Sequence, residues 1–177
     1  RPCYMKDHFS IHHGPVYLKA DLDDVLKTVR TFLNDHPTEF IIMRLLKEYI
    51  EVSDSKMNDL FRQYYDRYED MFYRADDVSN PTVGEMRGKV LLISDRWTLP
   101  EDIPYIYVTK DQDHEPFFAG CENFYIQDYS SLVTNWDLYD KWESVKHLLI
   151  EADAGSRIRI GTHVSGRSGY SAVVLSP

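Results

Sequence analysis

The sequence has few cysteines, no excess of positive charge and no long apolar run. Its 177 residues include 20 Lys and Arg against 29 Asp and Glu, which gives a net charge of -9. Such a charge repels nucleic acid and a strongly anionic membrane on average, so neither is expected as an electrostatic partner. No apolar run approaches the roughly 20 residues that a membrane-spanning helix needs, and no signal peptide is visible at the start. These absences predict a soluble chain.

The two cysteines, Cys3 and Cys121, form neither a CxxC motif nor a disulfide framework. They leave the redox compartment undecided, and a bridge between them is an open alternative. By contrast, hydrophobic residues make up 43% and aromatic residues 14% of the chain, which is typical of a folded globule. At this length we expect one domain, over residues 1–177. The chain begins without Met and ends on a strand-like run, so a fragment is expected.

Two adjacent histidines follow a short apolar run and precede a turn. Ser10-Ile11 suits a strand and Gly14-Pro15 ends it, so His12 and His13 are predicted at the carboxyl end of that strand. In α/β folds this edge carries the chemistry, and imidazole can transfer a proton near neutral pH. An ordinary pair of strand-end residues is the competing interpretation.

Apolar periodicity predicts helices and strands that alternate along the chain. A helix is expected after the N-cap residue Asp21, and it ends before Pro37. Near-continuous apolar runs at 39–46 and 90–94 are typical of parallel strands that are buried on both faces. Further helices are expected at 53–68 and 136–152, a long loop over 103–121, and short strands at 105–108, 124–126 and 157–164. This alternation indicates an α/β fold with a parallel sheet or barrel.

The sequence also predicts where several apolar side chains lie. In the helix at 136–152, the residues predicted to face inward are Trp142, Val145, Leu148 and Leu149. The aromatics that could touch lipid are Trp97, Phe117 and Phe118, and ordinary packing is an equal alternative for them.

Charged and polar side chains recur where the predicted strands end. They are His12, His13, Glu48, Asp95, Arg96, Asp128 and Arg1. Guanidinium groups pair bidentately with phosphate oxygens and imidazole moves protons, so this set suits a phosphodiester substrate. The chain has no G-x-S-x-G elbow, glycine-rich phosphate loop or H-E-x-x-H zinc motif. Surface ion pairing is the competing interpretation of the same residues.

The order of these motifs resembles the bacterial-type phosphatidylinositol-specific phospholipases C, the X-domain family. The matching segments are HHGPVYL at 12–18, FLNDHP at 32–37, EFIIM at 39–43, KEY at 47–49, RGKVLL at 87–92 and IQDY at 126–129. The resemblance runs over most of the chain. It implies a distorted TIM-like (β/α) barrel that is incomplete in this chain, without its N-terminal and C-terminal strands.

The resemblance also implies a reaction, which is an intramolecular phosphotransfer without metal or other cofactor. The inositol 2-hydroxyl of phosphatidylinositol, or of a glycosylated anchor, attacks phosphorus, and diacylglycerol leaves. By motif match His13 is the general acid, His12 is only its neighbour, and Arg1 contacts the phosphate from the end of the preceding strand. The residues implied for substrate binding are Glu48, Arg96, Asp128 and Tyr129. The implied setting is a secreted, monomeric phosphoric diester hydrolase or lyase that acts peripherally at a membrane surface.

Departures from the family pattern leave other functions open. The family's second histidine, in a Gly-Thr-His-Asp-Ser type motif, has no counterpart before Arg1, and Leu46 stands where family members can carry a lysine. The segment GTHVS at 161–165 resembles that motif, but its place fits a late barrel strand better. The alternatives are a non-catalytic barrel that binds a lipid headgroup or a protein, and a metal-dependent phosphodiesterase with a carboxylate cluster.

Overall fold

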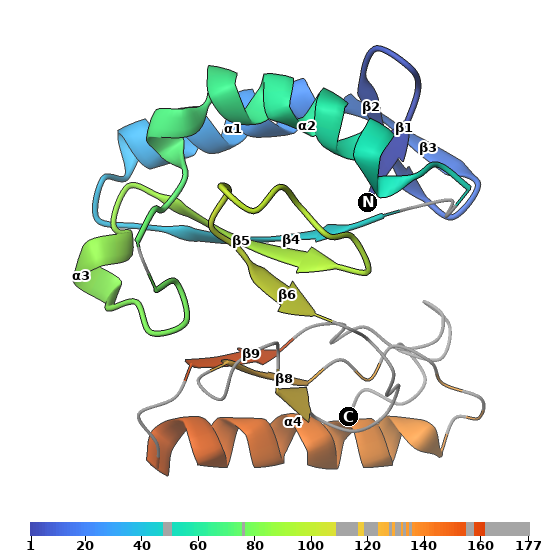
Figure 1. Ribbon diagram of the computed structural model, residues 1–177. Helices are drawn as coiled ribbons and strands as arrows, with labels where there is room; N and C mark the ends of the chain where they lie inside the picture. Colours follow the sequence, from blue (N-terminus) through green and yellow to red (C-terminus); the bar gives the residue numbers. More distant parts are fainter. Residues whose placement is uncertain are drawn as a thin grey trace. The chain divides into compact units, whose positions relative to one another are not determined.

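The computed structural model describes most of the first two thirds of the chain and part of the rest. The described residues are 1–47, 51–75, 77–108, 117–118, 124–127, 129, 132, 134, 136–154 and 158–161. They belong to two compact units, residues 1–108 and 109–177, which are described separately (Figure 1). Predictions for Glu48, Cys121, Asp128 and His163 lie outside the described residues.

The first unit begins with an antiparallel sheet of three strands. These are β1 (Pro2–Tyr4), β2 (Phe9–His13) and β3 (Val16–Asp21), in the order β1-β2-β3. His13 pairs with Val16 across a two-residue turn, in which Gly14 has a φ of 59°. Glycine adopts this φ readily, and tight hairpins need it at the first turn position. The expectation that strands and helices alternate throughout was therefore wrong here, because the histidine strand folds back on itself as a hairpin.

The second sheet of this unit is parallel, as the apolar runs predicted. It contains β4 (Ile41–Leu46), β5 (Val90–Asp95) and β6 (Ile106–Val108), with β5 in the centre. Every residue of β5 is buried, and Leu46 pairs with Asp95 at the carboxyl ends of β4 and β5. A central parallel strand is covered on both faces, which explains its continuous apolar sequence.

Helices α1 (Leu22–Asp35) and α2 (Asp54–Arg67) cover one face of this parallel sheet (Figure 1). Asp21 caps α1 as predicted, in a capping box with Asp24. The unit also contains a short 3-10 helix, η1 (Glu69–Met71), and the single-turn helix α3 (Val83–Met86). The shared core joins apolar side chains of both helices to Leu45 of β4 and Leu92 of β5. Alternation then puts Arg44 and Asp95 on the face away from the helices.

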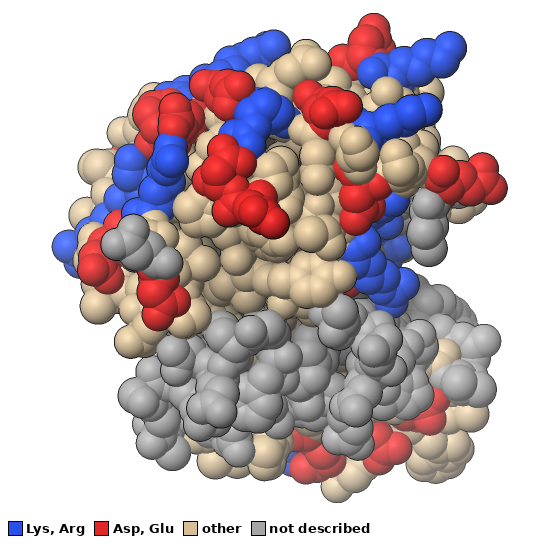
Figure 2. Space-filling view, in the orientation of Figure 1, with Lys and Arg blue, Asp and Glu red and all other residues tan. Residues whose placement is uncertain are grey.

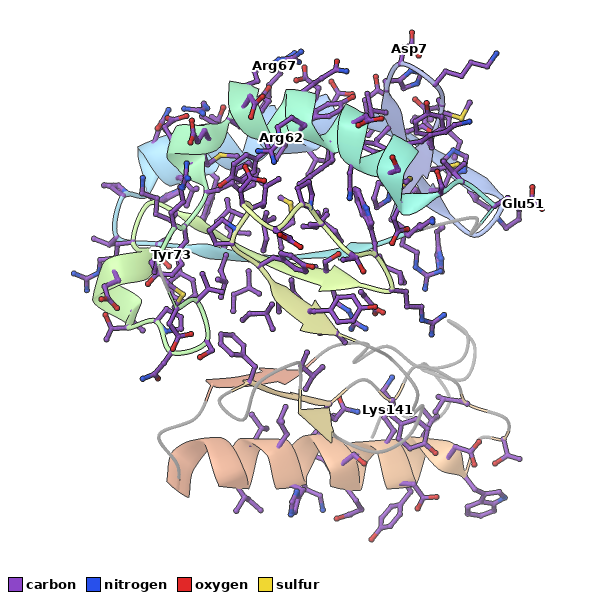
Figure 3. All side chains as sticks on the ribbon, in the orientation of Figure 1. Asp7, Glu51, Arg62, Arg67, Tyr73 and Lys141 are labelled. Atoms are coloured by element: carbon purple, nitrogen blue, oxygen red, sulfur yellow. The ribbon has the colours of Figure 1, made fainter. Side chains whose placement is uncertain are left out.

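The outer surface of the helices carries interleaved charges of both signs (Figure 2). Arg30 forms two hydrogen bonds with Asp70, of 2.7 and 2.8 Å. Arg67, which Figure 3 labels on α2, donates to Asp23 of α1 over 2.9 Å. Such mixed charge makes this face an ordinary solvated surface.

The second unit contains the strands β7 (Phe117–Phe118), β8 (Phe124–Gln127) and β9 (Ile158–Gly161) and the helix α4 (Asp137–Ala154). Strand β8 pairs antiparallel with β7 and parallel with β9. Leu148 is buried in α4 as predicted, whereas Trp142 and Leu149 are 54% and 58% exposed, so their inward assignment was wrong. Lys141 and Leu148 are buried seven positions apart on one side of α4, and Leu149 lies about 100° around the helix from Leu148.

The predicted fold class is confirmed as mixed α/β. The described strands form three three-stranded sheets that do not close into a barrel, which is consistent with the predicted incomplete barrel. Among the described helices, none combines the length and apolar character that crossing a membrane requires.

Candidate active site

Strand β2 separates the two histidines onto opposite faces. Phe9 is fully buried in the core, and Ile11 packs against the same core, so alternation puts His13 on the face that these residues share. His13 is the last residue of β2 and is exposed. His12 lies on the other face, where its ring is 5.4 Å from that of Tyr17. The geometry thus distinguishes an accessible His13 from a His12 that packs on the hairpin.

Arg1 lies beside the carboxyl end of β2. Its carbonyl accepts a hydrogen bond of 2.9 Å from the backbone N–H of His12. It was expected at the end of a preceding strand, but it directly precedes β1. Because β1 runs antiparallel to β2, the start of β1 comes to the same edge as the end of β2.

A second group of charges lies at the carboxyl ends of β4 and β5. Arg44 donates to Oδ2 of Asp95 through Nη2 and, over 3.1 Å, through Nε. Arg96 follows Asp95, and its Nε is 3.7 Å from Oδ1 of that carboxylate. The Arg96 side chain is 50% exposed, so it can reach a ligand. Guanidinium groups at this edge suit an anionic substrate.

Sequence reasoning placed Asp95 in the set of polar residues at the strand ends but gave it no individual role, and it assigned no site role to Arg44. A charged residue within the apolar run at 39–46 was the available signal for Arg44. The pairing itself spans 51 positions of sequence, so only the fold reveals it.

Trp97, which follows the carboxyl end of β5, packs against strand β2. Its ring is 5.7 Å from that of Phe9, and its indole N–H donates to Oδ1 of Asn58 over 2.8 Å. Trp97 is 0% exposed, so the suggestion that it could touch lipid was wrong, and ordinary packing is its role. The side chains of Phe117 and Phe118 are not among those described.

Lys47 anchors the chain next to the predicted residue Glu48. Lys47 is 8% exposed, and its Nζ donates to the carbonyl of Val52 and, over 2.9 Å, to Oδ1 of Asp54. A buried ammonium group is tolerated when it is paired in this way. These bonds hold Lys47 in place directly after β4.

The remaining predicted substrate residue that is described, Tyr129, belongs to the second unit and is 6% exposed. Within the first unit, the structure groups Arg1 with the histidines and groups Asp95 with Arg96. Among the described residues, no group of three or more His, Cys, Asp or Glu is arranged to hold a metal ion.

Residues 4–96 match the family model described as phosphatidylinositol-specific phospholipase C, X domain. This segment is more than half of the chain and contains both histidines and the Arg44–Asp95 pair. The chain belongs to the X-domain phospholipase C family.

Curated relatives of this X-domain chain are bacterial enzymes. A 1-phosphatidylinositol phosphodiesterase of Listeria monocytogenes is 40% identical over 97 residues, which are 52% of this chain and 30% of that enzyme. An enzyme of the same name from Staphylococcus aureus is 37% identical over 92 residues, 48% of this chain and 28% of the enzyme. The matched segment thus spans less than a third of these relatives.

Solved structures agree over a longer part of the X-domain chain. The phosphatidylinositol-specific phospholipase C from Listeria monocytogenes superimposes with a TM-score of 0.66 and 27% identity, over 94% of this chain and 60% of that one. A Staphylococcus aureus phospholipase C, solved in work on its membrane binding, gives a TM-score of 0.65 at 23% identity, over 95% of this chain and 58% of that one. The latter likeness concerns the fold alone.

Proposed function

We propose that the complete protein cleaves phosphatidylinositol by intramolecular phosphotransfer, with His13 as the general acid. The observation that supports this role best is the exposed position of His13 at the carboxyl end of β2, on the face opposite to His12. The family membership of residues 4–96 supplies the reaction class.

In the proposed reaction, the inositol 2-hydroxyl oxygen forms a bond to phosphorus while the bond to the glycerol oxygen breaks. The leaving oxygen takes a proton from His13, and the proton of the 2-hydroxyl goes to a base that we do not assign. The products are a cyclic inositol phosphate and diacylglycerol. Arg1 would neutralise charge on the phosphate, since a guanidinium forms strong hydrogen bonds with phosphate oxygens.

The proposed headgroup pocket completes the site. Its members are Glu48, Arg96, Asp128 and Tyr129. The carboxylates would accept hydrogen bonds from the inositol hydroxyls, and the Tyr129 ring would stack on the sugar face. No metal or other cofactor takes part in the proposed reaction.

The test is a matched pair of histidine variants of the complete protein, assayed on vesicles that contain phosphatidylinositol. His13→Ala is expected to lower release of cyclic inositol phosphate by about a hundredfold to ten-thousandfold, the usual contribution of a positioned acid. His12→Phe keeps an aromatic ring next to Tyr17 and is expected to retain most activity. Near-normal turnover in His13→Ala, measured by phosphorus NMR, would sink the assignment.

A second candidate function is a non-catalytic barrel that binds a lipid headgroup or a protein. It is motivated by Leu46, which stands where the family can carry a lysine and which pairs with Asp95 at the strand ends. Binding of inositol 1-phosphate in calorimetry, without any product from the complete wild-type protein, would favour this candidate. Loss of turnover on adding EDTA would instead point to a metal-dependent phosphodiesterase.

The proposal also includes a setting for the enzyme. We expect a secreted monomer that acts peripherally at membranes and does not bind nucleic acid. Assays on a glycosylated anchor alongside the free lipid would show which of the two is the better substrate.

A further inference from the structure

The carboxyl end of β5 holds a buried carboxylate that the proposed reaction does not use. Asp95 is 0% exposed, and both hydrogen bonds from Arg44 go to its Oδ2. Within the described part of the chain, no group donates a hydrogen bond to the other oxygen, Oδ1. Buried acceptors normally have a donor, so this oxygen requires an explanation.

The guanidinium of Arg96 also lies near Oδ1. The Nε of Arg96 lies 3.7 Å from Oδ1, which is an ion-pair distance but is too long for a hydrogen bond. The side chains of Arg44 and Arg96 are 17% and 50% exposed. The carboxylate therefore lies between a more buried arginine, which fixes it, and an accessible one.

The backbone at Arg96 is held in an uncommon conformation. Its φ is 56°, in the left-handed region that residues other than glycine rarely adopt. Its N–H donates to the carbonyl of Val108 over 3.2 Å, and the Ser94 hydroxyl donates to the carbonyl of Trp97. These bonds lie on both sides of Arg96, and strained backbone conformations of this kind are concentrated at functional sites.

We propose that Asp95 is a positioning residue: Arg44 fixes its carboxylate, and the carboxylate aims the Arg96 guanidinium at the inositol phosphate headgroup. The proposal rests on the proposed function and deepens it. When the headgroup binds, the contact between Arg96 Nε and Asp95 Oδ1 shortens to a hydrogen bond, because such bonds often tighten only in the complex. Asp95 itself touches no substrate atom, so its effect passes entirely through Arg96.

A double-mutant cycle in the complete protein separates this role from a general structural one. The variants are Asp95→Asn, Arg96→Gln and the double variant, and the readout is the Kd for inositol 1-phosphate from calorimetry. Each single variant is expected to weaken binding by about ten- to a hundredfold, the usual range for a hydrogen bond to a charged group. The double variant is expected to bind no more weakly than Arg96→Gln alone. Additive losses would overturn the proposal.

A second variant keeps the test decisive if Asp95→Asn does not fold. Arg44→Met with Asp95→Leu replaces the whole buried ion pair by apolar side chains, which proteins often tolerate. This variant is expected to fold and to bind inositol 1-phosphate as weakly as Arg96→Gln does. Wild-type affinity in it would overturn the proposal. Asp102→Asn, which removes an exposed ion pair with Arg62, is the control and should bind normally.

Measurements of binding and turnover on the wild-type protein distinguish a failure of this inference from a failure of the proposed function. If the wild-type protein binds inositol 1-phosphate but releases no cyclic product, the phosphodiesterase proposal fails while the cycle still decides the role of Asp95. If the wild-type protein shows neither binding nor turnover, both proposals are overturned.

Discussion

The Phe9 ring packs on the Trp97 indole, with centroids 5.7 Å apart and an interplanar angle of 60°. Both side chains are 0% exposed. Phe9 begins the strand that ends at His13, and Trp97 follows Arg96 directly. This contact therefore links the position of His13, the proposed acid, to the position of Arg96, which is proposed to bind the headgroup.

Removing the Phe9 ring should destabilise the fold strongly. We expect Phe9→Ala to lower the free energy of unfolding by about 3–5 kcal/mol, since it leaves a cavity among aromatic rings. Urea unfolding followed by tryptophan fluorescence measures this loss. Phe32→Ala is the control, because Phe32 is 41% exposed and its loss should cost far less. Equal losses in the two variants would contradict this account of the core.

Adjacent tyrosines of α2 should respond oppositely to removal of their hydroxyl groups. The Tyr64 hydroxyl accepts a hydrogen bond of 3.2 Å from the backbone N–H of Phe9. The Tyr65 hydroxyl is buried, and no described residue is its hydrogen-bond partner. Tyr64→Phe should lower the free energy of unfolding by about 1 kcal/mol, whereas Tyr65→Phe should leave it unchanged or raise it by about that amount. A clear loss of stability in Tyr65→Phe, measured by urea unfolding, would show that its hydroxyl does have a partner.

Local patterns predicted most elements of the first unit. Asp21 before a run with helical spacing identified α1 and its cap, and the apolar runs at 39–46 and 90–94 identified β4 and β5. These predictions succeeded because the buried positions of a helix or strand recur at a regular spacing along the sequence. Strand β3 gave no such signal, since most of its side chains are exposed and Lys19 interrupts the pleat with a φ of 58°.

The candidate site could be predicted only in part. The motif around His13 indicated the strand end, but the face of each histidine depends on where Phe9 packs. The partnership of Arg44 with Asp95 depends on the register of β4 against β5. The face of each histidine and the pairing of Arg44 with Asp95 both depend on contacts between residues far apart in the sequence. The spacing of neighbouring apolar residues does not reveal such contacts.

Acid should weaken the link between the two helices at Asp23. The Lys27 ammonium, 2.6 Å away, and then the Tyr68 hydroxyl and Arg67 guanidinium hold the pKa of the Asp23 carboxyl below its ordinary value of 3.8. A carboxyl with a lowered pKa contributes stability above its ordinary pKa, and this stability is lost as the pH falls through the lowered value. Asp23→Asn should therefore reduce the free energy of unfolding by about 1 kcal/mol near neutral pH.

Urea unfolding at a series of pH values tests this dependence. The difference between wild type and Asp23→Asn should shrink as the pH falls below the ordinary pKa of 3.8, because the wild-type carboxyl then also becomes neutral. Lys27→Met keeps Asp23 but removes the largest cause of its lowered pKa, so the acid loss should begin at a higher pH than in wild type. If the free energies of unfolding of wild type and Asp23→Asn differ by the same amount at every pH, the contribution of Asp23 does not depend on its charge.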